Sequence, residues 1–153
     1  MTTCFFIGHR DTPDTVLPAL MQEVERHIVE LGVTDFLVGH YGRFDALAAK
    51  AVLDAKQHHP EVTLALLLPY HPFDRPIPTP EGFDRTLYPP GQETVPMRLA
   101  IVRADRWALE QSGSLIAYVR RPSAGSREVL EAALTRQRRG LMRVINLAGW
   151  YPE

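Results

Sequence analysis

Residues 4–10, Cys-Phe-Phe-Ile-Gly-His-Arg, set the architecture that this chain is expected to adopt. Residues 4–7 form a short apolar run typical of a buried strand, and a glycine, a titratable ring and a guanidinium follow at its end. Residues 12–14, Thr-Pro-Asp, then supply a helix N-cap, a proline at the first helical position and an acid in the first turn. A buried strand followed by a polar exit and a helix is the first unit of an α/β fold.

The same alternation continues along the rest of the chain. Apolar runs predict strands over Cys4–Ile7, Asp35–Val38, Val62–Leu68, Ser114–Val119 and Leu141–Leu147. Amphipathic segments predict helices that begin after Thr12, near Asp45, at Met97 and at Arg127. Strands that alternate with helices form a parallel sheet covered on both faces. We therefore expect one Rossmann-like three-layer α/β domain over residues 1–153, with about five parallel strands in the order 3-2-1-4-5.

Composition narrows the class of protein. The chain has 153 residues, of which 45% are hydrophobic and 23% charged, as in an ordinary soluble globular domain. The net charge of -1 argues against a nucleic-acid binder, since such proteins usually carry a basic excess. No signal peptide or membrane-spanning run is apparent, so we expect a cytoplasmic protein without a membrane partner. The single cysteine, Cys4, is expected to be a buried core residue.

The segment Pro69–Pro96 interrupts the alternation. It contains eight of the 13 prolines and only two glycines, together with several aromatic residues. Loops of this length are usually functional lids or disordered, and the aromatic residues favour an ordered loop packed on the body of the domain. We expect an irregular loop that could cover a pocket.

Polar and small residues gather where strands end and helices begin. Residues 8–10, 39–45 and 120–126 each combine small residues with an arginine or a hydroxyl. In an open parallel sheet, ligands bind at the carboxyl ends of the strands, where helix N-termini attract anions. These exits predict a site for a nucleotide or another phosphate-bearing small molecule, although glycines and caps there also fit ordinary turns. The candidate ligand-binding residues at the exits are Gly8, His9, Arg10, Gly42, Arg43, Asp45, Arg120, Gly125 and Ser126.

Several stretches together resemble one known family. They are FFIGHRDT at 5–12, GHYGRFDALAAKAV at 39–52, LLPYHP at 67–72, IVRADRW at 101–107, SLIAYV at 114–119 and RVINL at 143–147. In this order they resemble the YpsA-like branch of the SLOG superfamily, a group of poorly characterised bacterial Rossmann-like proteins. The superfamily is similar in fold to the cytokinin-activating phosphoribohydrolases and to the DNA-processing protein A family. The resemblance implies a pocket for a nucleotide or a nucleotide-derived ligand at the first and fourth strand exits.

The resemblance also adds candidate residues and shows departures. Relatives often have the sequence Arg-Arg-Asn-Arg-Trp where this chain has Arg103-Ala104-Asp105-Arg106-Trp107. The resemblance implies ligand-binding roles for Arg103 and Arg106. Asp105 replaces a neutral asparagine. The glycine pair of the fourth exit is reduced to Ala124-Gly125, which narrows the room for a phosphate. A homodimer is expected by analogy with the superfamily alone.

The sequence favours a protein that binds or senses its ligand over an enzyme. Phosphoribohydrolases of similar fold carry Pro-Gly-Gly-x-Gly-Thr-x-x-Glu, and aligning Gly125-Ser126 with Gly-Thr places Val129 at the glutamate. Glu128 is one position early, about 100° away around the helix. The alternative is a hydrolase of an N-glycosidic or phosphate bond, with Asp45, Asp105 or Glu128 as the acid–base group. A second alternative is a nucleic-acid-associated module like the DNA-processing proteins.

Cofactor and metal motifs are missing from the sequence. It contains neither GxGxxG nor GxxxxGK[ST], so no dinucleotide fingerprint or P-loop is predicted. Among the six histidines, His9, His40 and His71 follow strands, but no spaced His or carboxylate pair accompanies them. We therefore expect neither a cofactor nor a metal.

Overall fold

The computed structural model describes residues 2–40, 42–121 and 124–151, with Ala124 described by its backbone alone. It confirms an α/β sandwich built on one parallel sheet, with the strand order β4-β3-β2-β1-β5-β6. The five predicted strands are β1 (Thr3–Gly8), β2 (Asp35–Val38), β3 (Thr63–Leu67), β5 (Ser114–Tyr118) and β6 (Arg143–Asn146). Their order is the predicted 3-2-1-4-5.

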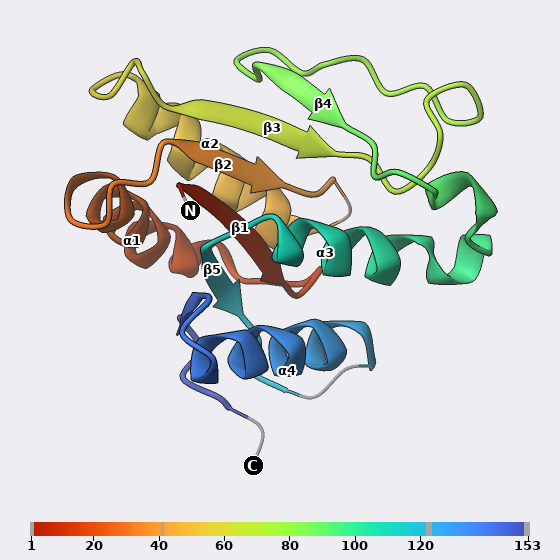
Figure 1. The fold of residues 1–153 in the computed structure, drawn as a ribbon. Helices are drawn as coiled ribbons and strands as arrows, with labels where there is room; N and C mark the ends of the chain where they lie inside the picture. The colour runs from red at the N-terminus through yellow and green to blue at the C-terminus, as the bar shows by residue number, and fades with distance from the viewer. Residues whose placement is uncertain (1, 41, 122–123, 152–153) are drawn as a thin grey trace.

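The sheet has a sixth strand that the sequence did not predict. The strand β4 (Arg85–Leu87) pairs parallel with β3 at the outer edge of the sheet (Figure 1). It lies inside the Pro69–Pro96 segment, which also contains the short 3-10 helix η2 (Gln92–Thr94). The expectation of an irregular loop throughout this segment is therefore wrong. Three residues between prolines are too few for an alternating pattern to be recognised.

The helices occur where amphipathic segments predicted them. They are α1 (Leu17–Val29), α2 (Arg43–Lys56), α3 (Ala100–Glu110) and α4 (Ala124–Arg138), with the 3-10 turns η1 (Asp14–Val16) and η3 (Met97–Leu99) leading into α1 and α3. Their starts differ from the predicted ones: α3 begins at Ala100 after the turn η3, and α4 begins at Ala124 and not at Arg127, so Gly125 and Ser126 lie in the helix. The first helix also differs at its start. The Thr12 hydroxyl donates to the carbonyl of His9 at 2.7 Å and does not cap the helix, so the chain makes a 3-10 turn before α1 begins.

Each face of the sheet packs against two helices. Alternate residues of β1 point to opposite faces, because the side-chain period of a strand is two residues. Cys4 and Phe6 pack with α1 and α2, whereas Phe5 and Ile7 pack with α3 and α4. Figure 1 shows α2 behind the sheet and α3 in front of it. The buried Cys4 is part of the first of these cores, as expected.

The strand β1 lies in the middle of the sheet. The strands that follow it in the chain are added first on one side of β1 and then on the other. From β1 the chain adds β2 and β3 on one side, and it returns to add β5 and β6 on the other. The switch point is therefore between β1 and β5, where Gly8 is in register with Tyr118. Open α/β sheets bind ligands outside the carboxyl ends of the strands at this point.

The end of β1 is in close contact with the first turn of α2. Phe44 is fully buried, and its ring fills the space beside Gly8. A Cβ built on Gly8 would lie 2.3 Å from the Cγ atom of Phe44 and 2.7 Å from its Cβ atom. The glycine is therefore needed for the packing of α2 against the end of β1.

None of the helices within the described ranges is long and apolar enough to cross a membrane.

We predict that Gly8→Ala destabilises the protein by roughly 1–3 kcal/mol, because the added methyl group overpacks the contact with Phe44. Chemical denaturation measures the free energy of unfolding of the variant and the wild-type protein. In a Phe44→Ala background most of the ring contact is gone, so the penalty of Gly8→Ala should shrink. Equal penalties in both backgrounds would contradict this packing account.

Candidate ligand-binding site

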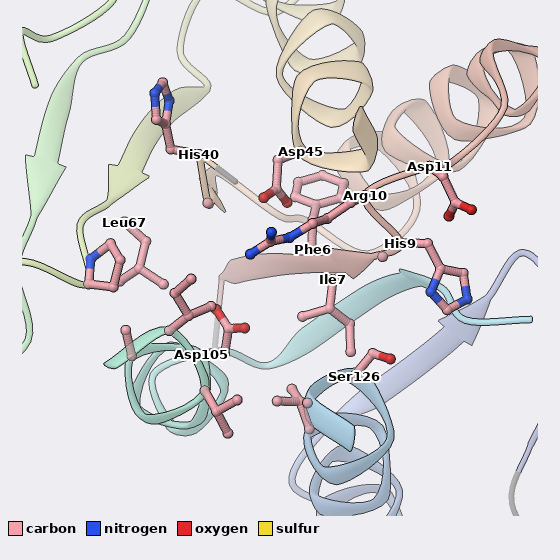
Figure 2. A pocket seen from close by; sticks show the side chains of 18 of the residues that line it. Phe6, Ile7, His9, Arg10, Asp11, His40, Asp45, Leu67, Asp105 and Ser126 are labelled. Atoms are coloured by element: carbon pink, nitrogen blue, oxygen red, sulfur yellow. The ribbon is translucent and has the colours of Figure 1, made fainter. Parts of the chain in front are cut away.

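A cavity of about 530 Å³ opens at the switch point of the sheet. Its volume is within the range of small-molecule sites. Segments that are far apart in the sequence form its wall: the exits of β1, β2 and β3, the first turns of α2 and α4, and one side of η3 and α3 (Figure 2). The polar lining residues are His9, Arg10, Asp11, His40, Asp45, Arg98, Asp105, Arg121 and Ser126.

The cavity brings together six of the candidate ligand-binding residues that the sequence placed at strand exits. They come from three different exits and are Gly8, His9, Arg10, Asp45, Gly125 and Ser126. Gly42 lies just behind this wall, where an added Cβ would be 3.0 Å from the Cα atom of Arg10. Residues Tyr41, Pro122 and Ser123, which belong to the predicted exits, lie outside the described residues.

The other predicted arginines lie elsewhere. Arg43 extends away from the cavity and pairs with Asp14 at 2.7 Å. Arg103 and Arg106 line a second hollow between α3 and α4, where Arg106 pairs with Glu128 at 3.0 Å. The side chain of Arg120 is not part of the cavity wall and approaches Asp11 at 3.6 Å.

His9 joins the exits of β1 and β5. The residue is 5% exposed, and its Nε2 atom accepts a hydrogen bond from the backbone N–H of Arg120 at 3.0 Å. This bond requires an unprotonated Nε2 atom, so the proton of the neutral ring is on Nδ1. Burial lowers the pKa of His9, and the positive charge of Arg121 lowers it further. His9 is therefore a neutral acceptor that holds two strand exits together.

The backbone that follows β1 accepts hydrogen bonds from the N-terminus of α2. The N–H groups of Arg43 and Phe44 donate to the carbonyls of Arg10 and His9, at 3.0 and 3.4 Å. Two of the free N–H groups of this helix are thus used within the protein. The first turn of α4 contributes Gly125 and Ser126 to the cavity, whereas the first turn of α2 contributes the acidic Asp45.

Two lining residues of the cavity, Asp11 and Arg121, form an ion pair. Arg121 donates to both carboxylate oxygens of Asp11, at 2.9 and 3.0 Å. This bond, chiefly with Arg121, lowers the pKa of the Asp11 carboxyl. The pair ties the β1 exit to the β5 exit a second time, and it partly neutralises Arg121.

Two arginines of the cavity remain without such partners. Among the described residues, neither Arg10 nor Arg98 forms an ion pair or a side-chain hydrogen bond, and both are exposed at the cavity wall. Figure 2 shows the Arg10 guanidinium extending into the cavity. Arginine suits planar, bidentate recognition of phosphate. Arg98 was not predicted, because it lies in the first turn of a predicted helix and no strand exit or motif marks it.

Two carboxyl groups from different helices point into the same cavity. Asp45 is in the first turn of α2 and Asp105 is in α3 (Figure 2). The apolar residues Ile101 and Val102 of α3 line the same cavity. Burial raises the pKa of Asp105 well above its ordinary value, and the negative charge of Asp45 adds to the rise. The cavity therefore contains a carboxyl group that favours its protonated form.

The apolar part of the cavity was also missing from the prediction. It consists of Phe6, Ile7, Leu67, Pro69, Ile101, Val102, Ala104 and Val129. In the sequence these residues cannot be told apart from the rest of the core. Of the Pro69–Pro96 segment, only Pro69 contributes to the lining that the structure describes.

Comparison with protein-family models and with curated proteins gives no match. Within the described ranges, no group of three or more His, Cys, Asp or Glu side chains could hold a metal ion.

We predict that His9 makes folding sensitive to mild acid. Its pKa is lowered from 6.5 in the folded protein, so the unfolded chain binds the proton more readily between these two pKa values. The resulting stability is present above pH 6.5 and is lost as the pH falls from there through the folded pKa. Urea titrations from pH 7.5 to pH 5.5 should show His9→Gln losing less unfolding free energy than the wild type. Parallel losses in both proteins would contradict the role of His9.

We predict the opposite sign for Asp105. A raised pKa means that folding disfavours the ionised form, so stability is lost as the pH rises from the ordinary value of 3.8 through the folded pKa. Asp105→Asn cannot ionise and should melt at a higher temperature than the wild type at pH 8. The gap should close towards pH 4. The exposed Asp54→Asn on α2 is the matched control and should show no such gap.

Proposed function

We propose that this protein binds or senses a nucleotide or a nucleotide-derived phosphate ligand in the cavity between β1 and β5. The observation that carries the proposal is the meeting of the α4 N-terminus with Arg10 and Arg98 around one cavity of about 530 Å³. Backbone N–H groups at a helix N-terminus and unpaired guanidinium groups both favour a phosphate.

The remainder of the cavity suits the rest of such a ligand. Aliphatic side chains of β1, β3 and α3 provide an apolar surface, as expected for a flat nucleobase. The carboxyl groups of Asp45 and Asp105 offer no positive charge to a phosphate and can instead hydrogen-bond to sugar hydroxyls or base edges. The cavity is therefore polarised in the way that a nucleotide requires.

We also propose that the chain is a member of the SLOG superfamily, in its YpsA-like branch, which the strand order and the position of the cavity support. By analogy with that superfamily we propose a homodimer. A small-molecule ligand is favoured over a nucleic acid because the net charge is -1 and several arginines outside the cavity are used in ion pairs. These pairs are Arg26–Glu23, Arg43–Asp14, Arg106–Glu128 and Arg127–Glu131.

Thermal-shift and calorimetric titrations with nucleoside mono- and diphosphates and ADP-ribose test the proposal. We expect at least one of these compounds to stabilise the wild-type protein. Arg10→Ala and Arg98→Ala should each weaken its binding about tenfold or more, because a hydrogen bond to a charged group contributes roughly 1.5–3 kcal/mol.

Arg103→Ala is the matched control, since this arginine lies in the second hollow outside the cavity. Its affinity should equal that of the wild type. A stabilising ligand that binds Arg10→Ala and Arg98→Ala unchanged would place the site elsewhere, and an Arg103→Ala defect would move it to the second hollow.

A further inference from the structure

Arg98 lines the cavity from a turn that has no buried residue of its own. The turn η3 is three residues long, and its neighbours of Arg98 are open to solvent: Met97 is 55% exposed and Leu99 is 40% exposed. The N–H of Leu99 donates to the carbonyl of Pro96 at 2.9 Å, which closes the turn on itself. Hydrophobic burial therefore does not fix where Arg98 lies.

A buried glutamine bridges this turn. Gln92 in η2 is 4% exposed, and its Nε2 atom donates a hydrogen bond to the carbonyl of Ala100 at 2.6 Å. Ala100 is the first residue of α3 and is also buried. The bond closes a loop that runs from η2 to α3 and contains the whole of η3, with Arg98 inside it. A buried polar side chain requires a partner, so this bond specifies one arrangement of the loop.

The start of this loop is connected to the wall of the cavity. Leu67 lines the cavity and is in register with Leu87 of β4. The N–H of Leu68 donates to the carbonyl of Leu87 at 2.8 Å. After β4, the N–H of Gln92 donates to the carbonyl of the buried Pro89 at 3.3 Å. Gln92 therefore joins a segment that is fixed to the sheet with the helix that follows Arg98, along the path from β4 to α3 in Figure 1.

We infer that Gln92 is a positioning residue, which holds Arg98 at the place where the phosphate of the ligand binds. The inference rests on the proposed function, in which Arg98 binds that phosphate. Gln92 is not among the lining residues of the cavity and acts through Arg98. A guanidinium group that is held in place before the ligand arrives loses less conformational freedom on binding. The segment Pro69–Pro96 thereby takes part in ligand binding through its C-terminal end.

The coupling between this hydrogen bond and the ligand is reciprocal. Since the bond from Gln92 favours phosphate binding by Arg98, the bound phosphate in turn stabilises the loop that the bond closes. Two backbone hydrogen bonds report on the start of this loop. The N–H of Thr94 donates to the carbonyl of Gly91 at 3.2 Å, and the N–H of Val95 donates to the carbonyl of Gln92 at 3.1 Å.

Calorimetric titrations with the mono- and diphosphates of adenosine, guanosine, cytidine and uridine, and with ADP-ribose, provide the test. Gln92→Met keeps a side chain of similar length and removes the donor. It should weaken the binding of each compound that the wild type binds by about three- to tenfold, the range of one neutral hydrogen bond. Thr94→Val is the matched control, because the Thr94 hydroxyl donates only to the carbonyl of Gly91 within the same turn. Its affinity should equal that of the wild type.

A double-mutant cycle separates positioning from a general loss of structure. In an Arg98→Ala background, Gln92→Met should cause no further loss of affinity, because the arginine that it positions is gone. In an Arg10→Ala background it should cause its full loss, since Arg10 comes from the exit of β1. Equal losses in both backgrounds would overturn the inference and leave the proposed function standing.

Hydrogen exchange on the wild-type protein gives a readout that does not require Gln92→Met to fold. A bound nucleotide should slow the exchange of the Thr94 and Val95 amides, and it should not do so in Arg98→Ala. Exchange that the nucleotide leaves unchanged in the wild type would overturn the inference, and so would binding that needs Arg10 but not Arg98. In both cases the proposed function stands. If none of the compounds binds, the proposed function fails and the inference fails with it.

Discussion

The hydrogen bonds of His9 hold the cavity in place. Its ring accepts the N–H of Arg120 at the β5 exit, and its backbone carbonyl accepts N–H groups from Thr12 and from Phe44 of α2. One residue thus connects β1, β5 and α2, which are the three elements around the switch point. Because the ring must stay neutral and unprotonated at Nε2, the whole arrangement depends on a desolvated histidine. Arg10 follows in the chain and is carried into the cavity by this connection.

Most of the fold could be predicted from the sequence because it rests on hydrophobic periodicity. Four-residue and longer apolar runs marked β1, β2, β3, β5 and β6, and the topology rules for parallel sheets then gave their order. The edge strand β4 was not predicted, because it is three residues long and depends on pairing with β3. The 3-10 turn before α1 was not predicted. The Thr12 hydroxyl donates a hydrogen bond to the carbonyl of His9, and the local sequence Thr-Pro-Asp does not distinguish this bond from a helix cap.

The site was less accessible to sequence reasoning. Strand exits indicated where polar residues would meet, so Arg10, Asp45 and Ser126 could be found. What the exits could not show is which groups already have partners within the protein. Gly8 gives its space to Phe44, and Arg43 has its charge paired with Asp14. Arg98 lies on η3, and only tertiary contacts turn it toward the cavity. Asp105 on α3 was a candidate acid–base group, but no strand exit indicated that it faces the same cavity.

One cavity contains two arginines, Arg10 and Arg98, and two carboxyl groups, Asp45 and Asp105. A phosphate bound at the arginines therefore leaves the sugar and base of the ligand to the side of the carboxyl groups. The central claim is that Arg10 and the first turn of α4, with Gly125 and Ser126, face a single anion-holding space. A crystal structure of the protein grown with AMP examines this claim most directly. The account predicts phosphate density between the Arg10 guanidinium and the N–H groups at the start of α4, with the sugar beside Asp45 and Asp105. A cavity filled by side chains, or a nucleotide bound only at the second hollow, would contradict it.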